Sequence, residues 1–236
     1  MAELDLARFQ LEFLPAAISP EALAQNERTV DDQLRALRLA RPDGTPTVTA
    51  ILVIGKEPRS WIPGAYIQFL RVDGPNLVDP MLDNREIAGT VTDQLRQMDD
   101  IVRLHIARAA TVGGPRRVDA RDYPEEALRQ LIRNAVLHRT YEGTHAPVRV
   151  TWFDDRVEIQ SPGGPYGQVT RQTFGQPGVT DYRNPTLAEA LKSLGFIERF
   201  GVGFAIVRHA LSRNGNPDLE LTVEDAHILA AIRRKT

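Results

Sequence analysis

The chain of 236 residues is long enough for one large domain or two small ones, and 42% hydrophobic with 25% charged residues is ordinary for a globular protein with a real core. A formal net charge of -2 gives no overall attraction to nucleic acid or to an anionic membrane. Because cysteine is absent, disulfide frameworks, thiol nucleophiles and cysteine-based metal sites are excluded.

The N-terminal residues MAELDLARFQLEF lack the basic stretch and apolar run of a secretory signal. No segment of the chain approaches 18 consecutive apolar residues, the length that a membrane-spanning helix requires. We therefore expect a cytoplasmic protein that makes no membrane contact.

The first half of the chain is expected to combine short helices with a small sheet. Residues 1–40 predict two or three short helices, the second capped by Ser19. Residues 48–54 are predicted to be a buried strand from their length and branched side chains, and 65–72 a second strand after a proline-rich loop. Both tryptophans, Trp61 and Trp152, are assigned to the core.

A long amphipathic helix is predicted over about 83–110, ended by Gly113, Gly114 and Pro115. Spacing along the helix gives it a buried face of seven apolar residues, Ile87, Val91, Leu95, Met98, Ile101, Val102 and Ile106.

The second half predicts alternating helices and strands. These are a helix over 124–138, a hairpin of 148–153 and 156–160, helices over 184–195 and 204–211, and strands near 219–223 and 227–232. Between the hairpin and the next helix lie about twenty residues with little periodicity. A loop of that length inside a compact domain is typical of a lid or of a disordered segment.

One helix carries an unusual polar row. In LIRNAVLHRTYEG, residues 131–143, the apolar stripe is accompanied by Asn134 and His138, and steps of four residues connect them to Gln130 and Glu126. Residues four apart lie on one face of a helix, so the row follows the edge of the buried face. On its own such a row is more often a solvated helix surface than a binding site.

A second candidate is the segment 199–204, RFGVGF, in which Gly201 and Gly203 precede a helix. The first turn of a helix exposes unpaired backbone N–H groups at its positive dipole end, and this arrangement binds phosphate. A lone Gly-x-Gly is more often a tight turn, so the motif gains weight only from its neighbours.

The order of these features resembles the Bergerat (GHKL) ATP-binding fold of type II topoisomerases and histidine kinases. More closely, YPEEALRQLIRNAVLHRTY, VRVTWFDDRVEIQSPGG and RNPTLAEALKSLGFIERFGVGFAIV resemble the C-terminal part of a bacterial family of AlbA-like (Schlafen-type) transcriptional regulators, also described as RecG-C-terminal-like ATP-binding proteins. The resemblance extends over residues 45–225.

This resemblance implies an α/β (α+β) fold, a two-layer sandwich of helices on a mostly antiparallel mixed sheet. We expect 1–82 to form an N-terminal helical and small-sheet segment and 83–236 the GHKL-like ATP-binding domain. Family members usually carry a preceding AlbA-like domain that binds DNA. This chain begins at or after the end of such a domain, so DNA is expected only indirectly, through that domain or a partner, and a homodimer is possible.

For the cofactors ATP and Mg²⁺, the resemblance implies that Asn134 holds the metal on the nucleotide phosphates. An amide oxygen suits a hard cation that keeps most of its waters. The residue four before this asparagine is normally a glutamate that activates water, but here it is Gln130, which cannot accept a proton at neutral pH. The resemblance therefore implies no catalytic residue at that position and inefficient hydrolysis.

The remaining nucleotide contacts are expected from two glycine boxes and two flanking residues. Where the wider superfamily has an aspartate that reads adenine, this chain has Ser161 before Gly163 and Gly164, so base specificity is open. Phosphate contacts are expected from Gly201, Gly203, Arg183 and Asn184, the last two being alternatives as a lid latch or helix cap. His138, also at the nucleotide site, is more easily explained by a structural hydrogen bond, and the histidines lack zinc-site spacing.

The sequence thus favours an ATP/Mg²⁺-binding regulatory module, with a lid over 165–183 that orders on binding. Two alternatives stay open. One is an active ATPase in which another group activates water. The other is a degenerate scaffold for dimerisation or protein interaction, marked by side chains such as Tyr166 or Phe174 filling the pocket.

Overall fold

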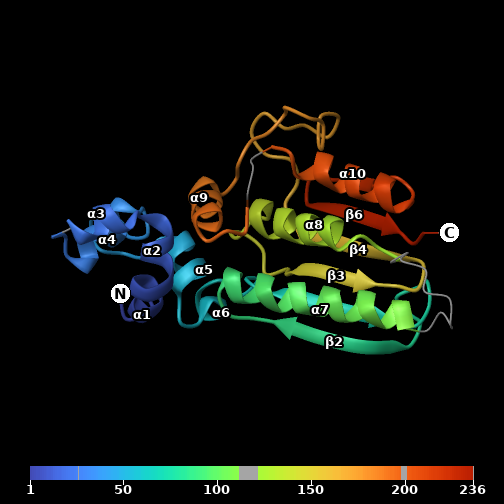
Figure 1. The fold of residues 1–236 in the computed structure, drawn as a ribbon, viewed down its shortest axis with the longest axis horizontal. Helices are drawn as coiled ribbons and strands as arrows, with labels where there is room; N and C mark the ends of the chain where they lie inside the picture. The colour runs from blue at the N-terminus through green and yellow to red at the C-terminus, as the bar shows by residue number, and fades with distance from the viewer. Residues whose placement is uncertain (26, 112–121, 198–200, 236) are drawn as a thin grey trace.

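The computed structural model describes residues 1–25, 27–111, 122–197 and 201–235, with the backbone alone for 107–111. Its strands form one six-stranded sheet in the order β2-β1-β3-β4-β6-β5 (Figure 1). The strands are β1 (Ile67–Val72), β2 (Met81–Ile87), β3 (Val148–Trp152), β4 (Arg156–Pro162), β5 (Glu220–Val223) and β6 (His227–Arg233). Strands β1 and β3 pair in parallel and the other neighbours pair antiparallel, which confirms the predicted mostly antiparallel mixed sheet.

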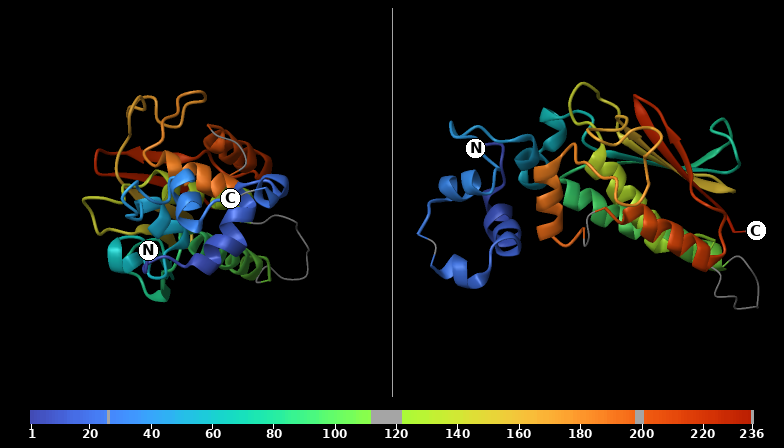
Figure 2. Two further views of the ribbon diagram at one scale, coloured as in Figure 1. Left: turned by 90° about the vertical axis from the view of Figure 1, so that its left-hand side faces the viewer. Right: turned by 90° about the horizontal axis from the view of Figure 1, so that it is seen from above.

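Three helices lie side by side on one face of this sheet, as the view from above shows (Figure 2). They are α7 (Val91–Thr111), α8 (Glu125–His138) and α10 (Gly203–Asn214), with α8 between the other two. Leu128, Leu131 and Ile132 of α8 are buried with Val150 and Ile159 of the sheet. The two layers confirm the predicted α/β sandwich.

The N-terminal residues form a separate group of short helices at one end of the sandwich (Figure 1). Ser19 caps its helix as predicted, because its hydroxyl accepts the amide of Ala22 at 3.3 Å. The group contacts α9 (Pro185–Ser193) through α2 and α5. Its elements are α1 (Leu6–Arg8), the π-helix η1 (Phe9–Phe13), α2 (Leu14–Ala17), α3 (Pro20–Ala24), α4 (Val30–Ala36), α5 (Val48–Ile54) and α6 (Pro58–Trp61).

The strand predicted for residues 48–54 is wrong, because these residues form helix α5. Thr47 begins the helix, and its hydroxyl accepts the amide of Ala50 at 3.2 Å. Residues 49–54 are all buried, so the helix has no polar face and its sequence lacks the period that distinguishes a helix from a buried strand. The strand predicted at 65–72 is confirmed as β1, but it pairs with β2 and β3 and not with residues 48–54.

The long helix predicted from residue 83 begins later, because Met81–Ile87 form the edge strand β2. Gly89 has a positive φ of 96°, and the Thr90 hydroxyl then accepts the Asp93 amide at 3.3 Å, so α7 begins only at Val91. Six of the seven residues predicted for the buried face lie on α7 and are buried, whereas Ile87 is buried as part of β2. The predicted end at 113–115 lies outside the described residues.

The domain boundary expected between residues 82 and 83 falls within β2. Strand β1 before this boundary and strand β3 after it belong to the same sheet. The prediction for Trp152 is confirmed, whereas Trp61 is 60% exposed. In the second half, every predicted helix and strand is present as α8, β3, β4, α9, α10, β5 and β6.

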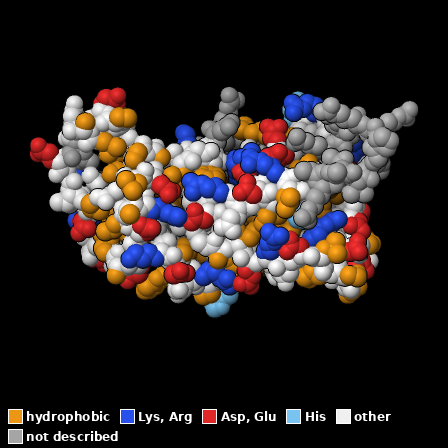
Figure 3. All heavy atoms as spheres, turned by 60° about the horizontal axis from the view of Figure 1, so that its bottom comes forward, with side chains coloured by type: hydrophobic (Ala, Val, Ile, Leu, Met, Phe, Trp, Pro, Cys, Tyr) orange, Lys and Arg blue, Asp and Glu red, His pale blue; other side chains and the backbone are white. Residues whose placement is uncertain are grey.

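Charged side chains of both signs are interspersed on the face shown in Figure 3. Between α7 and α8, Asp99 pairs with Arg129 at 2.8 Å and Arg133 at 3.2 Å. Among the helices in the described ranges, none combines the length and apolarity needed to cross a membrane.

Removing the α5 cap tests the corrected secondary structure. We expect Thr47→Ala to lower the free energy of unfolding by about 1 kcal/mol, because the Ala50 amide loses its acceptor. Thr47→Ser keeps the hydroxyl and should stay close to wild type. Chemical denaturation checks both variants, and equal stability of Thr47→Ala and wild type would contradict the capping role.

Candidate functional site

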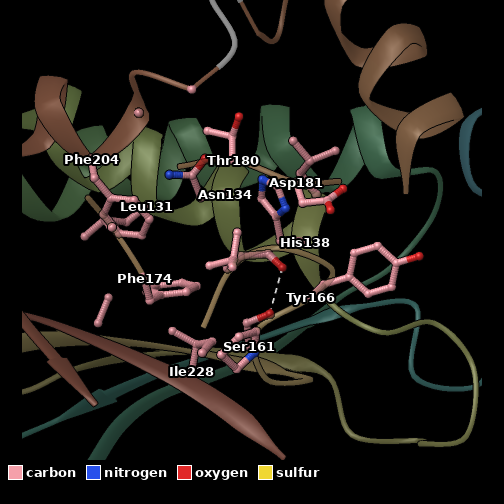
Figure 4. Close-up of a pocket in the computed structure, with 18 of the residues that line it drawn as sticks. Leu131, Asn134, His138, Ser161, Tyr166, Phe174, Thr180, Asp181, Phe204 and Ile228 are labelled. Atoms are coloured by element: carbon pink, nitrogen blue, oxygen red, sulfur yellow. Dashed lines mark hydrogen bonds between the residues drawn. The ribbon is translucent and has the colours of Figure 1, made fainter. Parts of the chain in front are cut away.

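A cavity of about 150 Å³ lies between α8, the end of β4, the start of α10 and the loop 165–183 (Figure 4). The polar row predicted on α8 reaches it, since Gln130, Asn134 and His138 all line the cavity. Glu126 does not. Of the remaining predicted site residues, Ser161, Gly163, Gly164, Gly201 and Gly203 also line it.

Asn134 and Gly203 meet where α10 begins. A Cβ atom at Gly203 would lie 2.8 Å from Nδ2 of Asn134, so the absence of a side chain allows this approach. No side chain caps the N-terminus of α10 in the described part of the chain, and this helix therefore presents free amides beside Asn134. Gly201 also has a positive φ of 76°. Arg199 and Phe200, part of the same predicted motif, lie outside the described residues.

The Asn134 amide has no hydrogen-bond partner within the described residues, which leaves its oxygen available to a ligand. Oxygen donors of this kind suit Mg²⁺, which is usually held by few protein atoms together with phosphate oxygens and waters. The described residues contain no cluster of three or more His, Asp or Glu that could hold a metal alone. Mg²⁺ would therefore fit here together with an anionic ligand.

Ser161 and Asn184 are used by the fold itself. The Ser161 hydroxyl donates to the carbonyl of Ala135 at 2.9 Å, and the Asn184 amide donates to the carbonyls of Leu137 at 2.7 Å and Arg139 at 2.9 Å. Asn184 thus caps the C-terminal end of α8, whereas its side chain makes no capping hydrogen bond at the start of α9, the helix for which a cap was predicted. Ser161 can still accept a hydrogen bond from a ligand.

The first glycine box, Gly163 and Gly164, lies where the chain leaves β4 and packs closely on neighbouring backbone. Gly163 has a φ of 97°, and a Cβ atom at Gly164 would lie 2.5 Å from the carbonyl oxygen of Glu224. The guanidinium of Arg183 donates to the Gly164 carbonyl at 3.0 Å and lies over the ring of Tyr166. Arg183 therefore ties together the two ends of the loop 165–183, while its roles as a lid latch or a phosphate contact stay predictions.

His138 is half-buried beside Arg183 and stacks on Tyr182, with ring centroids 5.3 Å apart. Burial, assisted by the charge of Arg183, lowers the pKa of His138 to about 4. The imidazole is therefore neutral at physiological pH, so it can donate or accept a hydrogen bond but adds no positive charge for phosphate.

The loop 165–183 has no helix or strand but is anchored to its surroundings. Arg171 pairs with Glu224 at 3.3 Å and with Asp225 at 2.7 Å, in the β5–β6 turn. Arg208 of α10 donates to the Gly175 carbonyl at 2.7 Å. Phe174 contacts Phe204 edge to face inside the cavity, with centroids 5.4 Å apart. The loop thus covers the site in this structure.

Several lining residues were not predicted from the sequence as site residues, among them Thr180, Asp181 and Phe204. Asp181 is the single acidic residue among the described residues that line the cavity. In the sequence, Asp181 is marked only by its place in the loop just before Arg183 and Asn184. Aspartate is common in polar loops, so this position alone does not identify a site residue.

The comparison with known protein families finds a match in the C-terminal part of the chain. Residues 145–232 match the family model described as "Putative ATP-dependent DNA helicase recG C-terminal". The match includes both glycine boxes, Arg183 and Asn184, and begins after Asn134. No curated protein sequence matches the chain.

Among solved structures, the DIP2311 protein from Corynebacterium diphtheriae is 18% identical with a TM-score of 0.70. The similarity covers 99% of this chain but 38% of that one, so this chain spans well under half of that protein's length. At this identity the similarity shows a shared fold. The histidine kinase AdeS of Acinetobacter baumannii is also matched, at 14% identity over 47% of this chain and 44% of that one, with a TM-score of 0.27.

The lowered pKa of His138 predicts acid sensitivity. Unfolding restores the pKa of His138 from about 4 to its ordinary 6.5, so between these values the unfolded chain binds the extra proton and stability falls as pH falls. The complete loss is roughly 3 kcal/mol. We expect His138→Gln to flatten this part of the stability profile, measured by denaturation between pH 7 and 4. Parallel profiles for the two proteins would contradict this.

Proposed function

We propose that this chain is an ATP-binding regulatory module of the Bergerat (GHKL) type, which holds ATP with Mg²⁺ and hydrolyses it inefficiently. The observation that carries the proposal is the contact between Asn134 and Gly203 at the uncapped start of α10. It places an amide oxygen suited to Mg²⁺ beside free backbone amides suited to phosphate. The family match over 145–232 supports an ATP-binding domain.

The rest of the cavity offers an apolar slot for a base. Leu131, Ile159, Ile228 and Ala230 line it between helix and sheet. Small-molecule sites of this kind typically have volumes of about 300–1,000 Å³, larger than the 150 Å³ present here. Nucleotide entry therefore requires the loop 165–183 to move outward. We propose that this loop is the lid whose position reports nucleotide binding to a partner or a second subunit.

The role in transcription is proposed from the resemblance to AlbA-like regulators. In such an arrangement, DNA would contact a domain or partner outside this chain, and the ATP-binding module would act on it through its lid or through homodimerisation. In the predicted cytoplasmic setting, nucleotide occupancy would be the regulatory signal.

The non-binding scaffold is favoured by one observation. Phe174 projects into the cavity and packs on Phe204, as expected of a pocket filled by its own side chains (Figure 4). The same contact is expected of a lid that must open, so the two functions are separated by nucleotide binding itself.

Calorimetric titration of ATP in Mg²⁺ provides that separation. We expect wild type to bind, Asn134→Ala to lose about tenfold or more in affinity, and Gly203→Ala to weaken binding because its added Cβ displaces the Asn134 amide. Asn76→Ala, which removes an exposed amide from the β1–β2 turn, is the matched control. Absence of heat with wild type would favour the scaffold.

Hydrolysis is tested by restoring the carboxylate. We expect wild type to release phosphate slowly and Gln130→Glu to release it about a hundredfold faster, because a positioned general base typically contributes 10²–10⁴-fold. A phosphate-release assay at saturating ATP measures both. Rapid release by wild type that Gln130→Glu does not increase would show that another group activates water.

A further inference from the structure

Strand β2 is an open edge of the sheet. It is the last strand on one side of the order β2-β1-β3-β4-β6-β5, and it runs along the lower border of the ribbon in Figure 1. An edge strand has backbone N–H and C=O groups on its outer side that can pair with another chain. The opposite edge, β5, has four residues, and its Leu221 lies against Gly175 of the loop 165–183. The seven-residue edge of β2 is therefore the better candidate for such pairing.

Apolar side chains are exposed towards both ends of this edge. At the other end from the β1–β2 turn, Arg59 of α6 pairs with Glu86 at 2.8 Å, and the same helix carries the exposed Trp61. Near the turn, four aliphatic side chains are between 49% and 94% exposed: Leu77, Val78, Met81 and Leu82. Exposed apolar residues gathered along one open strand are typical of a protein-contact surface.

The charges of β2 complement a second copy of the same strand. Asp83 and Arg85 are two residues apart on one face of the sheet and pair at 2.8 Å. When two copies of β2 pair antiparallel about a twofold axis at Asn84, Asp83 of each copy lies opposite Arg85 of the other. The four charges then alternate in sign around the axis. An axis at Asp83 or at Arg85 would instead place like charges opposite each other, so the charges select one register.

The same register brings the apolar ends together. Leu82 of one copy lies opposite Glu86 of the other, at the end of the strand where Arg59 connects α6 with its Trp61. The twofold symmetry produces this contact twice. In β2, Leu82 is also an extra residue relative to β1, because Asp83 pairs with Arg71 and Met81 with Val72. Such a bulge confines regular pairing to a few residues, so the expected dimer is concentration-dependent.

We propose that the edge of β2 is a homodimer interface, in which two copies pair antiparallel about Asn84 and join their six-stranded sheets edge to edge. The inference goes beyond the proposed function. Strand β2 contributes none of the described residues that line the cavity, so the dimer forms whether or not nucleotide is bound.

Sedimentation equilibrium without nucleotide, at micromolar to sub-millimolar concentrations, tests the interface. We expect wild type to dimerise as the concentration rises. Arg85→Asp surrounds the axis with acidic side chains and Asp83→Arg surrounds it with basic ones. Each variant alone should therefore raise the dimer Kd by about tenfold or more. Asp218→Arg, which reverses an exposed charge just before β5 at the opposite edge, should dimerise like wild type.

Mixing the two variants separates charge matching from damage to the fold. In an equimolar mixture, the arginines of Asp83→Arg lie opposite the aspartates of Arg85→Asp, so we expect heterodimers. The double variant with both substitutions exchanges the two charges and should regain the homodimer. Variants that associate poorly only because they are damaged would not be rescued in either way.

Cysteine cross-linking tests the register. The chain has no cysteine, so Asn84→Cys provides a single thiol, which faces its own copy across the axis. Residues directly opposite in an antiparallel pair have Cβ atoms about 4.5–5.5 Å apart, close to disulfide range. Met81→Cys is the control, because the two copies of residue 81 would be about 20 Å apart. We expect mild oxidation to link Asn84→Cys into dimers and to leave Met81→Cys unlinked.

The inference is overturned by a wild type that stays monomeric throughout, or by a dimer that neither charge reversal weakens. Failure of Asn84→Cys to cross-link more than Met81→Cys also contradicts it, and this pair serves if a charge variant does not fold. None of these results bears on ATP binding, and the absence of ATP binding would leave the dimer intact. The two proposals are thus tested separately.

Discussion

The C-terminal end of α8 is the constraint on which the site depends. The last carbonyls of a helix have no partner within it, and burying them unpaired is costly. Here the carbonyls of Ala135, Val136 and Leu137 accept hydrogen bonds from Ser161, Tyr141 and Asn184 respectively. These partners come from the end of β4, the segment after α8 and the start of α9. Satisfying one helix end therefore fixes α8 against the end of β4, which lines the pocket, and against the start of α9, where the loop 165–183 ends.

The same helix end connects the pocket with the N-terminal segment. Arg139, almost completely buried, donates to the carbonyls of Gly64 and Ala146, and the first of these belongs to the chain that leads into β1. On the other side, Asn184 starts α9, which packs on α2 and α5. A displacement of the loop at its Asn184 end would thus act on a helix in contact with the N-terminal helices.

Sequence patterns predicted most of the sandwich because its helices and strands each have one buried and one exposed face, and this amphipathic period is visible in α7, α8 and the β3–β4 hairpin. The sequence predictions were wrong where a helix or strand lacks one buried and one exposed face. Helix α5 is buried on nearly every side, and the edge strand β2 is largely exposed, so its polar residues resembled the outer face of a helix. At the site, Asn134 and Gly203 followed from motifs, whereas Asp181 depends on how a loop without periodicity closes on Gly167.

Four consecutive residues of the loop neck have four different partners: Asp181 the Gln168 amide, Tyr182 the His138 ring, Arg183 the Gly164 carbonyl and Asn184 the end of α8. Insertion or deletion of a single residue within 181–184 would move at least one of them out of reach. The contacts of residues 169–179 are spaced more widely along the chain, with Arg171 paired to Asp225, Phe174 on Phe204 and the Gly175 carbonyl on Arg208. A change of chain length is therefore expected to disturb the neck at 181–184 more than the segments between these contacts.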